Sequence, residues 1–184
     1  ERPRPDPASA RKPLTFPFPF PNDEYPSPTI RARVFDQMLA RVTSVPGVRD
    51  AAATTGFPGS RLGILGSSTL TVSPDAKPVL AAVHAATPGF FETMGIPVTA
   101  GRTFTSADTE SAPGVAIVNQ QLADQFPGGN ALGQRIPIAI FGKTESFAVV
   151  GVTCNMRPTD HVGYRVLQPI AARWPYSLDL VFRG

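Results

Sequence analysis

The chain has 184 residues, of which 42% are hydrophobic and 17% are charged, proportions typical of a globular domain rather than a disordered or fibrous chain. The net charge is +3, and the basic residues form no run of five or six. The sequence therefore gives no support for a nucleic-acid-binding surface, and solvated surface charge is the simpler interpretation. Cys154 is the single cysteine, so no internal disulfide can form. No apolar run approaches the roughly 18 residues of a membrane-spanning helix. The first residue is Glu1 rather than methionine and nothing resembles a signal peptide, so we expect an excised piece, and anything that held it to a membrane would lie outside it.

The N-terminal segment changes character after residue 12. Residues 1–12 are polar and proline-rich, and we expect a flexible tail there. The stretch LTFPFPFP at 14–21 alternates proline with apolar side chains, which predicts a strand. Its prolines remove hydrogen-bond donors along one edge, so the strand should lie at the edge of a sheet. A polyproline ligand motif is the alternative. The side chains expected to point inward are Phe16, Phe18 and Phe20.

Residues 28–45 give the clearest helix. Ser27 is a suitable N-cap, Pro28 suits the first helical position, and Pro46 with Gly47 ends the helix. Apolar side chains recur at spacings of three and four and form one stripe, which we expect to face the core. The stripe consists of Ile30, Val34, Phe35, Met38, Leu39, Val42 and Val45.

Short strands and two brief helices follow. Thr87 is a candidate cap and Pro88 a candidate first residue for the helix PGFFETM, which Gly95 ends, and Asn119 can cap the helix QQLADQF. Strands are expected near 48–55, 67–73, 79–86, 114–118, 132–141, 146–154, 165–168 and 177–183. A two-helix section between groups of strands predicts an α+β fold rather than repeated βαβ units.

Two glycine-rich motifs that would indicate chemistry fail on their own residue requirements. FGKT at 141–144 resembles the end of a phosphate-binding loop, but Pro137 stands where that motif needs a glycine. Ser60 lies in the loop GFPGSRLGILG, but Pro58 replaces the first glycine of a nucleophile elbow. Neither motif predicts a site.

The titratable residues form no catalytic or metal-binding group in the sequence. His84, His161 and Cys154 are too far apart for zinc-ligand spacing. Asp108 and Glu110 are close enough to act as an acid–base pair, but two carboxylates in a solvated loop are the simpler interpretation. We therefore predict no catalytic residue, no cofactor and no metal ion, and we expect a binding or mechanical domain.

The stretch TPGFFETMGIPVTAGR at 87–102 begins a longer series, which continues with TFTSAD, GVAIVN, QLADQFPGGNALGQRI and FAVVGV. In order and spacing this series resembles the MacB-like periplasmic core domain of ABC-transporter permeases in the MacB/FtsX superfamily. More closely, it is similar to the permeases common in acidobacteria. The resemblance runs from about Leu14 to the end of the chain, and PGVRDAAATTGFPG fits it as the strand and loop after the first helix.

The resemblance implies an extracytoplasmic domain held between the first two transmembrane helices of a permease, with no chemistry and no cofactor of its own. A separate cytoplasmic domain hydrolyses ATP and the outer domain moves in response, which is called mechanotransmission. The implied partners are a second permease copy, the cytoplasmic ATPase domain and an extracytoplasmic accessory protein, whereas the isolated chain should be monomeric. The implied architecture is a porter-like lobe of residues 13–86 and 145–184 with a smaller inserted lobe of residues 87–144.

The residues singled out have structural roles. Arg102 is expected to pair with Asp108 or with nearby carbonyls and so fix a loop. The structural positions are Pro88, Gly89, Phe90, Phe91, Gly95, Gly101, Arg102, Asp108 and Asn119. In the loop GFPGSRLGILG, the candidate partner contacts are Phe57, Leu62, Ile64 and Leu65, unless these four fold back on the core.

Two other functions stay open on the sequence. One is a free-standing periplasmic protein that binds a small molecule. The other is a hydrolase, which would need Ser60 or another hydroxyl within hydrogen-bond reach of a histidine. The transported substrate and the accessory partner do not follow from the sequence.

Overall fold

A computed structural model describes residues 14–19, 28–55, 66–73, 76–109, 111–140, 143–155, 164–169 and 177–183. Its elements in chain order are β1 (Leu14–Pro19), α1 (Pro28–Thr43), β2 (Asp50–Thr54), β3 (Gly66–Leu70), β4 (Val79–Ala86), α2 (Phe90–Met94), β5 (Val98–Gly101), β6 (Val115–Asn119), α3 (Gln120–Ala123), the 3₁₀ turn η1 (Pro127–Gly129), β7 (Arg135–Ile140), β8 (Lys143–Thr153), β9 (Tyr164–Pro169) and β10 (Ser177–Arg183). This is the predicted α+β class. The sequence prediction lacked one of these strands, β5.

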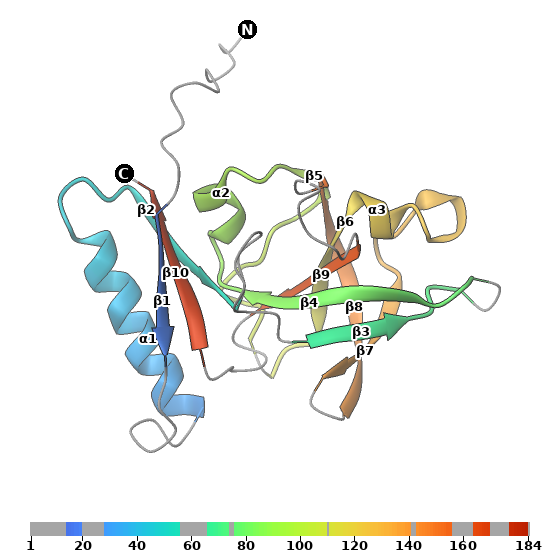
Figure 1. Ribbon diagram of the computed structural model, residues 1–184, viewed down its shortest axis with the longest axis horizontal. Helices are drawn as coiled ribbons and strands as arrows, with labels where there is room; N and C mark the ends of the chain where they lie inside the picture. Colours follow the sequence, from blue (N-terminus) through green and yellow to red (C-terminus); the bar gives the residue numbers. More distant parts are fainter. Residues whose placement is uncertain are drawn as a thin grey trace, which may run out of the picture.

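The first and last strands lie side by side. β1 pairs antiparallel with β10, with Leu14 opposite Phe182, and β10 pairs antiparallel with β2 (Figure 1). β1 stands at the end of the order β1-β10-β2-β4-β9-β6-β8-β5, so the predicted edge position is confirmed among the described strands. The inward orientation predicted for Phe16 is wrong, because its side chain is 58% exposed. Phe20 and the side chain of Phe18 lie outside the described part of the chain.

Helix α1 covers the sheet only in part. It packs on β2, two strands away from β1, and Phe35 is buried there (Figure 1). The apolar stripe predicted for this helix is therefore buried at its centre. It is not buried at its ends, where Ile30 is 46% and Val45 is 51% exposed. Length explains the difference: a helix of 16 residues is about 24 Å long, whereas a strand of five residues spans about 17 Å. The helix consequently extends past the strand that it covers.

The six strands β3, β4, β9, β6, β8 and β7 curl into a nearly closed ring. Each of them pairs with the next, and β7 contacts β3 to close it. At this seam the backbone N–H of Ala139 donates to Oγ of Ser68 over 3.0 Å. The ring encloses one hydrophobic cluster, to which all six strands and the α3 region contribute. Its largest buried side chains include Leu70, Ile136, Ile138 and Phe147.

Three threonines join the sheet of β1, β10 and β2 to this ring. β2 and β4 share one ladder pair, Thr54 with Ala86. Around it the hydroxyl of Thr54 donates to the Ala85 carbonyl over 3.0 Å, and Oγ1 of Thr55 accepts from the Ala85 N–H over 2.8 Å. The third hydroxyl, of Thr87, accepts from the N–H of Ala53 over 2.9 Å. Side-chain hydroxyls thus satisfy backbone groups where the regular ladder ends.

The predicted boundary between two lobes is wrong at the level of strand pairing. Three strands within residues 87–144 pair with β8, which the prediction assigned to the other lobe. The hydrogen-bonded sheet therefore runs undivided through residues 87–144. The apolar run within β8 predicts from the sequence that the strand is buried. Of its partners, β7 directly precedes it, whereas β5 and β6 lie farther back in the chain, and the sequence does not identify these pairings.

Candidate functional site

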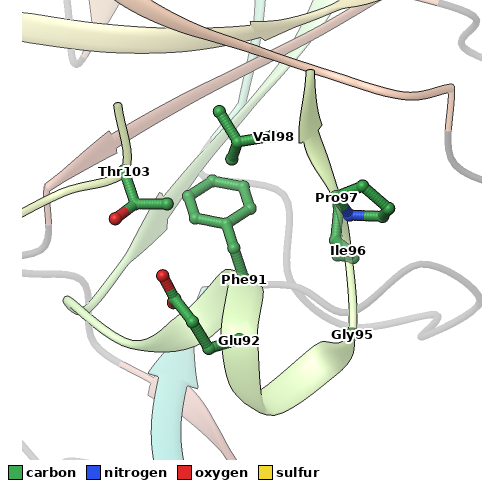
Figure 2. Close-up of a pocket in the computed structure, with 7 residues that line it drawn as sticks. All are labelled: Phe91, Glu92, Gly95, Ile96, Pro97, Val98 and Thr103. Atoms are coloured by element: carbon green, nitrogen blue, oxygen red, sulfur yellow. The ribbon is translucent and has the colours of Figure 1, made fainter. Parts of the chain in front are cut away.

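An open pocket of about 350 Å³ lies beside the short helix α2. Seven residues line it: Phe91, Glu92, Gly95, Ile96, Pro97, Val98 and Thr103. Figure 2 shows the ring of Phe91 between Thr103 on one side and Ile96 and Pro97 on the other, with Val98 above the ring and Glu92 on the helix below. The lining is mainly apolar, and its polar side chains are the carboxylate of Glu92 and the hydroxyl of Thr103. All seven lie within or directly after the stretch TPGFFETMGIPVTAGR.

Glycines set both ends of α2. Gly89 precedes the helix with φ 81°, and Gly95 follows it with φ 66°, a left-handed conformation that glycine adopts without strain. The predicted cap role of Thr87 is wrong, because α2 begins without a side-chain cap and the hydroxyl of Thr87 bonds to Ala53 instead. A buried threonine beside a neighbouring strand finds its partner there, which the local sequence does not reveal.

Phe91, which lines the pocket, belongs to a buried cluster of phenylalanines. Phe90 and Phe91 are 1% and 2% exposed, and their rings meet edge-on with centroids 5.5 Å apart. The ring of Phe91 also lies 5.9 Å from that of Phe104. These rings form one cluster with Ala52 of β2 and Ile117 of β6, so α2 is packed between the sheet and the ring of strands. The burial predicted for the two adjacent aromatics is confirmed.

The strand beside the pocket, β5, closes tightly on β8. Gly101 pairs with Gly151 across the ladder. A Cβ atom at Gly101 would collide with the carbonyl oxygen of Val150, and one at Gly151 would collide with that of Arg102. Gly101 also has φ 77°. Gly101 ends strand β5 rather than forming a turn, and both its left-handed backbone and the close backbone contact require glycine.

An ion pair fixes the loop that follows β5. Nη1 of Arg102 donates to Oδ2 of Asp108 and Nη2 donates to Oδ1, each over 2.8 Å. The N–H of Thr105 donates to the same carboxylate over 2.8 Å. The hydrogen bonds from Arg102 hold the pKa of the Asp108 carboxyl below its usual value, although burial acts in the opposite direction. This is the pairing that the sequence predicted, and it occupies both oxygens of the carboxylate.

Two charged side chains lie near the pocket. Glu92 is exposed at its mouth and makes no ion pair with a described residue. Arg183 does not line the pocket, but its guanidinium lies against Gly95, where an added Cβ would meet Nη2 at 3.0 Å. Nε of Arg183 is buried and finds no hydrogen-bond partner within the described part of the chain. The mouth therefore has an acidic group on its surface.

A polar group also forms where the parallel strands β6 and β8 end. Asn119 caps α3, as predicted, by accepting from the N–H of Leu122 over 3.3 Å. Asn155 accepts from Nδ2 of Asn119 over 3.3 Å and from the N–H of Gln121 over 2.8 Å. Sequence reasoning missed Asn155, because it follows a strand far from Asn119 in the chain and belongs to no motif.

Of the remaining predicted residues, the structure describes His84 and Cys154, and neither belongs to a group of metal-binding side chains among the described residues. His84 is 5% exposed within β4, and Cys154 is half-buried after β8. Ser60 and His161 lie outside the described residues, as do the candidate partner contacts Phe57, Leu62, Ile64 and Leu65.

The described ranges contain no group of three or more histidine, cysteine, aspartate or glutamate residues placed to hold a metal ion. Within the same ranges, no helix combines the length and the apolar character needed to cross a membrane.

Solved structures with the same fold include a periplasmic region and an extracellular domain. The periplasmic region of MacB from Actinobacillus actinomycetemcomitans has 14% identity and a TM-score of 0.61, over 95% of this chain and 76% of that one. The extracellular domain of the noncanonic ABC-type transporter YknZ from Gram-positive bacteria has 16% identity and a TM-score of 0.59, over 94% of this chain and 83% of that one. A domain of a protein assigned as a permease from Porphyromonas gingivalis has 21% identity and a TM-score of 0.54 over 79% of this chain, which spans 65% of that chain. At these identities the likeness shows a shared fold. No match was found among curated protein sequences.

The architecture defines an α+β domain in which the first and last described strands are neighbours and a ring of strands is joined to them by a short junction. The sequence model of the MacB-like periplasmic core domain matches residues 9–179. The chain belongs to this family.

Proposed function

We propose that this chain is the extracytoplasmic domain of an ABC-transporter permease, and that it couples ATP hydrolysis in the cytoplasm to a conformational change outside the membrane. The family match over residues 9–179 is the observation that carries this proposal. The domain itself is non-catalytic, and it works with a second permease copy, a cytoplasmic ATPase domain and an extracytoplasmic accessory protein.

The sheet geometry supports this role. Because Leu14 lies opposite Phe182 in the β1–β10 ladder, the chain enters and leaves the domain at one end of the same sheet. A domain built this way fits between two membrane helices that stand close together. A displacement of those helices would reach β1 and β10 first. It would then pass through β2 to the junction that Thr54, Thr55 and Thr87 form with the ring of strands.

The junction supports transmission rather than independent movement. Three buried threonines, Thr54, Thr55 and Thr87, bond the sheet to the ring of strands. The phenylalanine cluster of α2 fills the same boundary with apolar contacts. Breaking buried hydrogen bonds leaves unsatisfied backbone groups, so the two parts should move together.

Membrane topology gives the first test. In the full reading frame, Lys143→Cys places a thiol on an exposed position of β8, in a Cys154→Ser background. We expect a membrane-impermeant maleimide to label this thiol in intact spheroplasts. Labelling only after the membrane is permeabilised would contradict the proposed location, and a reading frame without flanking membrane helices would contradict the permease assignment.

A further inference from the structure

The ring of strands closes along one line without a backbone ladder. Its other five junctions, β3–β4, β4–β9, β9–β6, β6–β8 and β8–β7, are ladders of two to six residue pairs each. β3 and β7 lie next to each other (Figure 1), but among the described residues no ladder pair joins them. Within the same ranges, a single hydrogen bond crosses this seam, from the N–H of Ala139 to Oγ of Ser68 over 3.0 Å.

A proline prevents β7 from extending a regular ladder onto β3. In an antiparallel strand, alternate residues direct their backbone groups toward the same neighbour. Because the N–H of Ala139 points toward β3, position 137 faces β3 as well. Pro137 occupies that position and has no N–H to donate.

The hydroxyl of Ser68 replaces this ladder from inside the ring. Ser68 lies opposite Ala81 in the β3–β4 ladder, and residues directly opposite each other share a face. Ala81 belongs to the hydrophobic cluster that the ring encloses, so Ser68 faces the interior, where it is 2% exposed. A buried hydroxyl needs a hydrogen-bond partner, and the N–H of Ala139 is that partner.

The hairpin that carries β7 is attached to the ring on one side. β8 pairs with β6 from Ala148 onward and with β5 from Gly151 onward. Its first part, residues 143–147, pairs with β7 and with no other described strand. We call β7 and residues 143–147 the flap. Such a two-stranded arm can turn near Ala148 while the ladders of β8 with β6 and β5 stay intact.

Apolar side chains beneath the seam hold the flap closed most of the time. Leu70 from β3 and Ile136 and Ile138 from β7 are fully buried in the same cluster. Separating the two strands exposes this surface to water, which is unfavourable in proportion to its area. At every other junction, separation would break a ladder as well. The seam is therefore the line along which the ring opens at the lowest free energy.

We infer that the flap lifts away from β3 as a unit, that this movement opens the interior of the ring, and that Ser68 holds the flap closed. Thr54, Thr55 and Thr87 lie on β2, directly after it and directly after β4, outside the seam. The flap therefore moves without breaking the junction between the ring and the sheet of β1, β10 and β2. This movement within the ring does not require the proposed coupling role.

Thiol labelling under native conditions tests the opening in the 184-residue chain. Ile138→Cys places a thiol on the flap and Val118→Cys places one on β6, each in a Cys154→Ser background. Both positions are 0% exposed and belong to the same cluster, so each thiol reacts only when the structure opens. With rates corrected for reactivity in the unfolded chain and for global stability, we expect Ile138→Cys to react at least about tenfold faster. Equal corrected rates would overturn the inference.

Removing the hydroxyl tests the role of Ser68. Ser68→Ala should speed the labelling of Ile138→Cys about two- to tenfold, the scale of one neutral hydrogen bond, and leave Val118→Cys unchanged. Thr69→Val is the matched control, because Thr69 is the next residue of β3 and is exposed. Its labelling rate should stay the same. No change in Ser68→Ala, or an equal rise in Thr69→Val, would contradict the role given to Ser68.

Hydrogen exchange in the unmodified chain tests whether the flap moves as a unit. The amide of Ile138 points toward β8 within the flap, whereas the amide of Ala139 points across the seam. We expect Ala139 to exchange faster than Ile138, and equal exchange would mean that the hairpin frays instead. A flap without nucleotide-dependent movement of the domain would contradict the proposed function alone. Such movement without a flap would contradict this inference alone.

Discussion

The guanidinium of Arg102 holds the carboxylate of Asp108 through two parallel hydrogen bonds, each 2.8 Å long. The side chain of Asp108 is 7% exposed and that of Arg102 is 45% exposed. Solvent therefore screens the arginine but hardly reaches the carboxylate, which also accepts from the N–H of Thr105. The pair closes the loop that follows β5 and borders the pocket at Thr103.

Removing the charge of Asp108 should destabilise the domain. We expect Asp108→Asn to lower the free energy of unfolding by about 1–2 kcal/mol, because one charge-assisted bond is lost while the half-exposed arginine can be solvated. Urea denaturation measures the change. Asp36→Asn is the matched control, since Asp36 is exposed on α1, and its effect should stay within about 0.5 kcal/mol. Equal effects at the two positions would show that the ion pair does not stabilise the loop.

The same carboxylate predicts a pH dependence. Because the pKa of Asp108 is lowered in the folded state, its contribution is present above the unfolded pKa of about 4 and is lost as the pH falls through the folded value. Denaturation midpoints should therefore fall as the pH drops below about 4. The slope should be shallower in Asp108→Asn. An identical slope in the variant would mean that other groups govern the acid response.

Gly101 should tolerate no side chain. Gly101→Ala combines a left-handed backbone with a collision against Val150, and we expect it to lower the free energy of unfolding by about 3 kcal/mol or more. Gly133→Ala is a close control, because Gly133 has the same φ of 77° with nothing within 4 Å of an added Cβ. That variant should cost about 1 kcal/mol. Thermal or urea unfolding of both separates backbone strain from the close contact.

Thr87 should act through Ala53 and not as a helix cap. Thr87→Val removes the acceptor of the Ala53 N–H, so we expect a loss of about 1–3 kcal/mol and faster hydrogen exchange at Ala53. Thr87→Ser keeps the hydroxyl and should retain most of the protection. If exchange rises instead at the first amides of α2, Thr87 serves the helix after all.

The sequence predicted those features that depend on neighbouring residues. The helix at Pro28–Thr43, the buried strand before Asn119 and the cap by Asn119 follow from periodicity and local hydrogen bonding, and the structure has all three. The pairing of Arg102 with Asp108 spans only six positions, and the sequence predicted it as well. Elements set by distant partners were not predicted correctly. The role of Thr87 depends on Ala53, and the lobe boundary was wrong because β8 pairs with three strands that the prediction placed in the other lobe.

The pocket could not have been predicted from the sequence of residues 87–103, although these residues line it. Its apolar residues resemble ordinary core residues in the sequence, and it is the packing of α2 beside β5 that leaves space between Thr103 and Ile96. The sequence assigned structural roles to this segment, and the structure shows a pocket beside it.

Coupling between nucleotide state and the position of this domain is the central claim, and one distance measurement tests it most directly. A spin label at Lys143→Cys in the Cys154→Ser background is placed in the full-length permease, reconstituted in lipid nanodiscs. Electron–electron double resonance then gives the distance between labels in paired copies, without nucleotide and with ATP and vanadate. Our account predicts that the distance distribution shifts between the two states. An unchanged distribution in a permease that hydrolyses ATP would contradict it.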